Sequence, residues 1–122
     1  MTNHLGILAI CQQVETELQD AGIRAWVDAS KVTPPGVWIA PGNLSPDLLN
    51  GSGSAELELW LVAPDTSYMA ALRALDSLLG DVLAVVQPNG DMTPQSVQLP
   101  DFRVNLPAYR VPILATYTPT IT

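Results

Sequence analysis

The sequence predicts an α+β domain, with a mixed or antiparallel sheet of about five strands and two helices packed on one face of it. Three observations support this prediction. Residues 3–21 and 67–86 repeat apolar residues at steps of three and four, the period of a helix with one buried side. Residues 56–62 alternate leucine with glutamate or tryptophan, the period of a strand. Further strand-like segments lie between and after the helices, an order typical of α+β folds.

The first helix is predicted over residues 3–21. Thr2 or Asn3 can cap its start, and Gly22 is well placed to end it. Its apolar stripe consists of Ile7, Ile10, Cys11, Val14 and Leu18. The following residues, 23–29, predict a strand with Ile23, Ala25 and Val27 on one face and Arg24, Trp26 and Asp28 on the other.

The middle of the chain predicts a turn, a short strand and a long loop. Residues 31–35 form the turn, and residues 36–40 form a strand that Pro41 and Gly42 close. Residues 43–54 combine Asn, Ser, Pro and Gly with three leucines, which predicts a long loop of the kind that is usually functional or mobile. Residues 50–54 have the composition of a flexible tip.

The strand over residues 56–62 ends at Pro64, and a second helix is predicted over residues 67–86. Asp65, Thr66 or Ser67 can cap this helix, and the Pro-Asn-Gly sequence at residues 88–90 ends it with a turn. Its apolar stripe consists of Met69, Leu72, Leu75, Leu79, Val82, Leu83 and Val86.

Residues 96–105 and 107–117 predict two long antiparallel strands. In the second of them Pro112 cannot donate a ladder hydrogen bond, which indicates an edge strand or a bulge. One face of this strand carries Tyr109, Val111, Ile113, Ala115 and Tyr117. We expect residues 118–122 to be loose, and we expect one domain over residues 1–122 because the chain leaves little room for a second.

The composition indicates a protein that other proteins surround. Hydrophobic residues make up 48% of the chain and charged residues 14%, against roughly 25% charged in an average globular chain. Part of the surface is therefore expected to be an interface. The net charge of −7, with the five Lys and Arg scattered, argues against binding nucleic acid through its phosphates. With one cysteine and no apolar run of roughly 18 residues, we expect a soluble protein made in a cytosol, without intrachain disulfides.

The sequence provides few residues for catalysis, and we expect no enzyme activity, no cofactor and no metal site. His4 is the sole histidine and lies near the chain start, where we interpret it as a solvated residue. Cys11 lies on an apolar helix stripe, which favours a core role over a nucleophilic one. Glu56 and Glu58 share a strand face and are interpreted as its wet side rather than as a carboxylate pair.

Three tryptophans are the more informative residues. Alternation places Trp26 beside Arg24 and Asp28, and Trp60 beside the two glutamates. Either these rings anchor an interface, or a loop or the C-terminal strands cover them within the monomer. Together with the leucines of the predicted loop and two tyrosines, they make up the candidate interface residues: Trp26, Trp38, Leu44, Leu48, Leu49, Trp60, Tyr109 and Tyr117.

Two stretches and the element order around them support a family resemblance. The first helix ends in Gln-Asp-Ala-Gly-Ile at residues 19–23, and Lys-Val-Thr-Pro-Pro-Gly-Val-Trp-Ile follows at residues 31–39. The strand Glu-Leu-Glu-Leu-Trp-Leu-Val-Ala at residues 56–63 then leads into the second helix, and two C-terminal strands follow. Over nearly its whole length the chain resembles the tail terminator proteins of long-tailed bacteriophages, particularly the short ones of actinobacteriophages.

This resemblance implies a fold and a role. Tail terminators are α/β subunits that close into a hexameric ring on the last ring of the tail tube, stop tube polymerisation and present a surface to the head–tail connector protein. The resemblance implies a virion location in the tail or neck, the major tail tube protein as a partner, and a lumen through which DNA passes. An acidic subunit suits this lumen because it limits DNA sticking. The alternatives are another neck component, such as a head-closure or tail-completion protein, and a small non-catalytic binding module.

Overall fold

The computed structural model describes residues 2–3, 7–47, 52–100, 102–117 and 120–121, with only the backbone described for 2–3, 43–47, 52–54, 116–117 and 120–121. Five strands form one sheet in the order β2-β3-β4-β6-β5, and β1 pairs with β7 separately. The pair β2–β3 is parallel and the other neighbours are antiparallel, which confirms the mixed α+β fold. The strands are β1 Thr2–Asn3, β2 Ala25–Trp26, β3 Gly36–Asp47, β4 Ser52–Val62, β5 Thr93–Val97, β6 Leu106–Tyr117 and β7 Thr120–Ile121.

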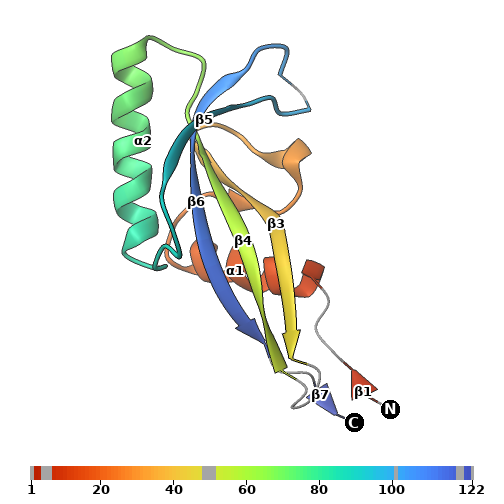
Figure 1. Cartoon of the computed structure of the whole chain (residues 1–122). Helices are drawn as coiled ribbons and strands as arrows, with labels where there is room; N and C mark the ends of the chain where they lie inside the picture. The colour runs from red at the N-terminus through yellow and green to blue at the C-terminus, as the bar shows by residue number, and fades with distance from the viewer. Residues whose placement is uncertain (1, 4–6, 48–51, 101, 118–119, 122) are drawn as a thin grey trace.

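Two helices, α1 (Ile7–Asp20) and α2 (Tyr68–Leu83), lie against one face of this sheet, with α1 over β2, β3 and β4, and α2 over β4 and β6 (Figure 1). Gly22 ends the first helical segment with a positive φ of 84°, a conformation that glycine adopts without a steric penalty. Ser67 caps α2, because its side chain accepts a hydrogen bond from the Ala70 amide. The core between helices and sheet includes Ile10, Leu18, Leu57, Leu59, Leu75, Val82 and Val111.

A second, smaller core lies on the opposite face of the sheet. Here the segment between β5 and β6 folds back over the strands, and the Phe102 amide donates to the Leu99 carbonyl over 3.0 Å. Leu99 is fully buried in this core, and Phe102 packs against it. The buried members are Val32, Val62, Leu99, Leu106 and Ala108, with the rings of Trp26, Trp38 and Trp60 packed against them.

This second core corrects two predicted strands. The strand predicted over residues 96–105 is wrong, because β5 covers Thr93–Val97 and the residues after it leave the sheet to cover the second core. The strand predicted over residues 23–29 shortens to Ala25–Trp26, and a 3-10 turn follows at Ala29–Lys31, where the Asp28 side chain accepts a hydrogen bond from the Ser30 amide. Tertiary packing has overridden local strand preference in both places.

The predicted long loop over residues 43–54 is also wrong. β3 continues to Asp47 and β4 begins at Ser52, so most of this segment extends a hairpin. Pro41 and Gly42 do not end β3, and the register shifts between Pro41 and Leu44 instead, as at a β-bulge. A Cβ on Gly42 would lie 2.6 Å from the Glu56 carbonyl oxygen, so the bulge depends on a residue without a side chain.

Four prolines of the sheet, Pro41, Pro46, Pro94 and Pro112, occupy positions where a missing N–H costs no ladder bond. The Val37 amide donates toward β2, so the alternation of backbone groups directs the nitrogen of Pro41 to the outer side of β3, beyond the short β2. The bulge shifts the register by one residue, which brings the nitrogen of Pro46 to the same side. By the same alternation Pro94 faces outward on β5. Pro112 belongs to the interior strand β6, contrary to an edge assignment, but it lies past the end of β5, where its carbonyl accepts from the Asn89 amide.

The second helix is turned relative to the prediction. Its buried residues are Ala71, Leu75, Leu78 and Val82, so only two residues of the predicted stripe are fully buried. Leu79 is half-buried, whereas Met69, Leu72 and Leu83 are exposed. The predicted stripe was too wide for one contact face, and α2 therefore carries apolar residues on a flank that points into solvent.

Candidate interface surfaces

The three tryptophans form a row across the sheet. Trp26 pairs with Trp38 across β2 and β3, and Trp38 pairs with Trp60 across β3 and β4. The ring centroids of Trp38 and Trp60 are 6.1 Å apart with planes tilted by 33°, a favourable geometry for an aromatic pair. Arg110 pairs with Trp60 on the next strand, so the row ends in a basic side chain. We call Trp26, Trp38, Trp60 and Arg110 the aromatic row.

Polar contacts hold two rings of the aromatic row, those of Trp26 and Trp38. The indole Nε1 of Trp38 donates to the Val27 carbonyl over 3.2 Å, and the Arg24 guanidinium lies 5.6 Å from the centre of the Trp26 ring. All three rings remain half-buried, although the smaller core packs against them. The monomer therefore covers part of this aromatic surface with its own residues. The rest stays exposed, as an interface with another chain would need.

An ion pair extends the aromatic row along β4. The Arg110 Nη1 atom donates to the Glu58 Oε2 atom over 2.7 Å, with about a third of each side chain exposed. The prediction that Glu56 and Glu58 both lie on a solvent-exposed strand face therefore needs a correction for Glu58. Glu56 is exposed, but Glu58 is half-buried beside a basic partner. Arg110 was not among the candidate residues, because its partner lies 52 positions away in the sequence.

The remaining candidates do not join this row. Tyr109 lies on the opposite face, where it packs against the helix-side core. Leu44 pairs with Ala55, and Tyr117 pairs with Gly53 at the far end of the hairpin, where only the backbone is described. Leu48 and Leu49 lie outside the described residues, as does His4.

Cys11 is in the core, as predicted, and only 2% of it is exposed. Burial raises the pKa of its thiol, which disfavours the reactive thiolate. Among the residues that the structure describes, no three His, Cys, Asp or Glu side chains gather as metal ligands. No helix in the described part of the chain is long and apolar enough to cross a membrane.

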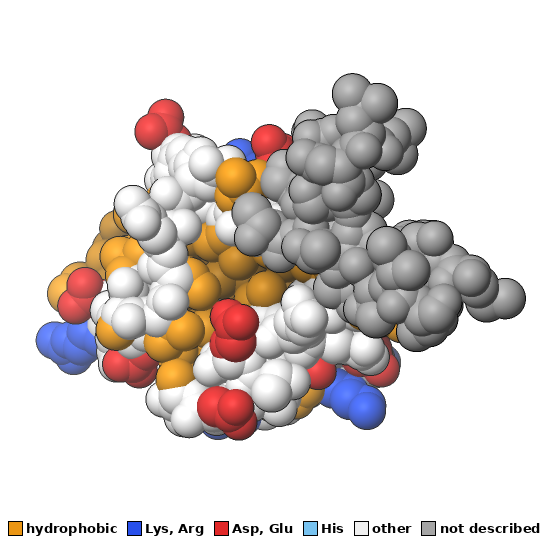
Figure 2. Space-filling view, turned by 90° about the horizontal axis from the view of Figure 1, so that it is seen from below, with side chains coloured by type: hydrophobic (Ala, Val, Ile, Leu, Met, Phe, Trp, Pro, Cys, Tyr) orange, Lys and Arg blue, Asp and Glu red, His pale blue; other side chains and the backbone are white. Residues whose placement is uncertain are grey.

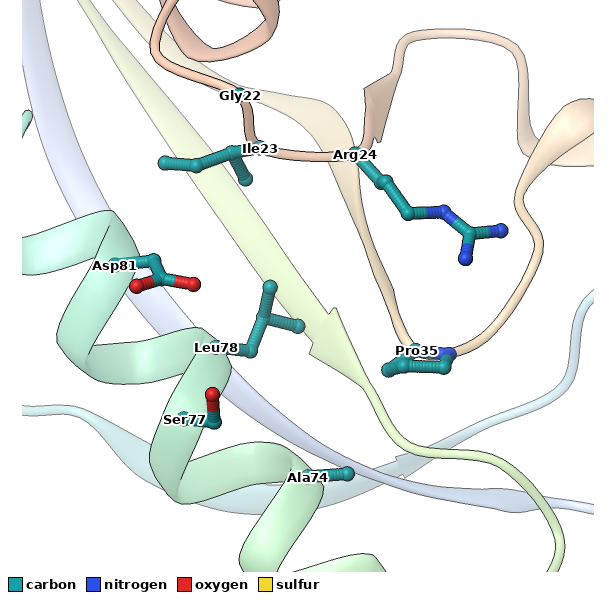
Figure 3. Close-up of a pocket in the computed structure, with 8 residues that line it drawn as sticks. All are labelled: Gly22, Ile23, Arg24, Pro35, Ala74, Ser77, Leu78 and Asp81. Carbon is teal, nitrogen blue, oxygen red and sulfur yellow. The ribbon is translucent and has the colours of Figure 1, made fainter.

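Small hollows lie around the helices in the described part of the chain. The first, of about 220 Å³, separates α2 from the segment that links α1 to β2, and Figure 3 shows that the Arg24 side chain extends away from the apolar Ile23 and Leu78 at its centre. The second, of about 280 Å³, lies where α1, the residues after α2 and β6 meet. Figure 2 shows the molecule from below, with hydrophobic side chains gathered in the middle of this face.

The third hollow lies on the other flank of α2. Leu72, Leu75, Asp76 and Leu79 of the helix line it together with Tyr109 of β6. The sequence pattern predicts that these leucines belong to the core. The indication that some of them do not is the number of apolar residues on α2, which is larger than one buried stripe needs.

Comparisons with family models and with curated sequences add no relative. No protein-family model matches the sequence, and no curated protein sequence matches it. The surfaces described above and the composition of the chain are therefore the basis for a functional proposal.

Proposed function

We propose that this protein is a structural subunit of a bacteriophage virion that forms a ring on the end of the tail tube. The ring ends tube polymerisation and joins the tail to the head connector. The proposal starts from the resemblance of residues 19–23, 31–39 and 56–63 to tail terminators. The observation that carries it is the aromatic row, which stays half-buried although the monomer has a second core beside it.

A ring also needs two different surfaces. Copies in a cyclic ring meet head to tail, so each copy presents two distinct complementary patches. The aromatic row, on the face of the sheet opposite the helices, supplies one of these patches. It offers large rings and an arginine, which are residue types enriched at protein interfaces. The net charge of −7 would keep DNA from binding the lumen wall.

The ring is tested by the mass of the purified protein in solution and by negative-stain imaging. We expect six-fold rings for the natural protein and for Trp60→Phe, which keeps an aromatic ring. Trp60→Glu and Leu114→Glu place charge on the same sheet face, and we expect both to give smaller species. Leu114 is exposed, so its variant leaves both cores intact.

Circular dichroism identifies variants that fail to fold. Folded Glu variants that still form rings would show that the aromatic row is not a ring contact. The capping role is tested separately, by adding the protein to tail tube subunits during polymerisation and measuring tube lengths in micrographs. Tubes that grow equally long with and without the protein would contradict the terminator role.

A further inference from the structure

An exposed apolar seam runs along α2. Its members follow one another at alternating steps of three and four residues, the spacing by which one helix packs along another. Met69 is 54% exposed, Leu72 36% and Leu83 38%, so the monomer does not bury the seam. We call this set the α2 seam: Met69, Leu72, Asp76, Leu79 and Leu83.

A slot lies beside the α2 seam. Tyr109, which contacts the hollow on this flank, pairs with Pro94 of β5 and so shares a sheet face with it. Pro94 and Ser96 are exposed, and the main contacts of the described helices with the sheet are to β2, β3, β4 and β6. The helix layer therefore ends one position short of the sheet edge. The slot is the open space beside α2 and above β5 and Tyr109.

The charge in this slot restricts its occupant. Asp76 stands in the middle of the seam between Leu72 and Leu79, and among the described residues no ion pair involves it. A helix packed on the seam would bury this carboxylate, which is costly without a cationic partner. A second copy of α2 in parallel would bring another Asp76 opposite the first. A partner helix with a basic residue at this level would neutralise it.

We propose that the α2 seam binds an amphipathic helix of another protein, which carries apolar residues along its contact side and a Lys or Arg opposite Asp76. This helix would lie beside α2 over β5 and extend the helix layer to the sheet edge. The inference goes beyond the proposed ring, because it applies to the free subunit in any oligomeric state.

The test uses two synthetic three-heptad peptides on the purified protein. Both have leucine at the a and d positions, except that the central a position is lysine in one and glutamate in the other. We expect the lysine peptide to bind more tightly and to shift the NMR signals of Leu72, Leu79 and Tyr109. Asp76→Lys should weaken its binding by about tenfold, equivalent to about 1.4 kcal/mol, and should favour the glutamate peptide.

Asp81→Lys is the matched control, because it makes the same charge change on the opposite flank of α2, and it should leave both affinities unchanged. Equal affinity of the two peptides for the natural protein would overturn the proposal, whether or not the variants fold. Equal affinity of the lysine peptide for the natural protein and Asp76→Lys would also overturn it. A change in the mass of free Asp76→Lys would show that a second copy covers the seam, and would overturn it too.

Discussion

At the scale of single residues, two glycines show how position decides the effect of a missing side chain. Gly42 lies in the bulge of β3, where a Cβ would meet the Glu56 carbonyl oxygen of the neighbouring strand at 2.6 Å. Gly80 lies inside α2, and a Cβ there would meet nothing within 4 Å. Backbone cannot move aside as the end of a flexible side chain can, so the two positions respond in opposite directions to the same substitution.

We expect Gly42→Ala to lower the free energy of unfolding by about 1–3 kcal/mol, the usual cost of overpacking. Gly80→Ala should raise it by about 0.5–1 kcal/mol, because alanine favours the helix. Urea unfolding followed by circular dichroism measures both changes. A stabilised Gly42→Ala would mean that the bulge is not as tight as described.

Cys11 provides a second test at this scale. Its pKa is raised above the ordinary 9.0 by burial, so the folded state holds the proton more strongly than the unfolded state. The contribution of this residue to stability is complete below about pH 9.0 and is lost as pH rises beyond it. We expect a thiol-reactive disulfide reagent to label the protein in urea but hardly at all in native buffer near neutral pH. Rapid native labelling would contradict the buried position.

Cys11 and Glu58 also show which residue environments the sequence could predict. The core position of Cys11 follows from the local period of one helix, and it is confirmed. The ion pair of Glu58 with Arg110 depends on the register between β4 and β6, which no local pattern contains. The row of tryptophans escaped prediction for the same reason, since it spans three strands.

At the scale of elements, strong hydrophobic periodicity predicted helices and strands correctly, whereas amino-acid composition wrongly predicted a loop. The strand over residues 56–62 and both helices are confirmed, with their ends shifted by a few residues. Residues 43–54 have the composition of a loop, yet pairing along β3 and β4 draws most of them into a hairpin. The face of α2 was ambiguous, because apolar residues cover more of its circumference than one contact needs.

A pair of leucines tests the orientation of α2. Leu75 is 6% exposed and Leu72 is 36% exposed, although both belonged to the predicted stripe. We expect Leu75→Ala to cost about 2–4 kcal/mol of unfolding free energy, because it leaves a cavity in the core. Leu72→Ala should cost less than about 1 kcal/mol, since a partly exposed side chain loses less buried area. Similar losses for the two variants in urea unfolding would contradict the described orientation.

At the scale of the whole molecule, the fold class followed from the order of elements, and the sheet order did not. The sequence predicts a strand over residues 96–105, but residues 98–100 and 102–105 leave the sheet beside the second core, where Leu99 is buried. Their position depends on contacts with residues far away in the sequence, which no local pattern contains. The result is one sheet with helices on one side and a thin cover on the other, so its two faces are unlike (Figure 1).

The outward prolines lead to a prediction at this scale. Replacing Pro41 and Pro94 together by threonine restores an N–H on each outer side of the sheet. We expect the double variant to form fibres at high protein concentration, measured by thioflavin fluorescence and electron microscopy. Pro100→Thr, outside the strands, is the control and should stay as clear as the natural protein. Equal behaviour of all three proteins would mean that these prolines do not protect the edges.

The same prolines restrict how copies of the protein can join. An open strand edge is a template on which identical chains stack without limit, and the outer sides of β3 and β5 interrupt this template at intervals. Growth in which the backbone of one chain pairs with that of the next is therefore disfavoured. Any contact between copies then depends on side chains. The placement of these prolines therefore works against fibre formation where the protein is concentrated.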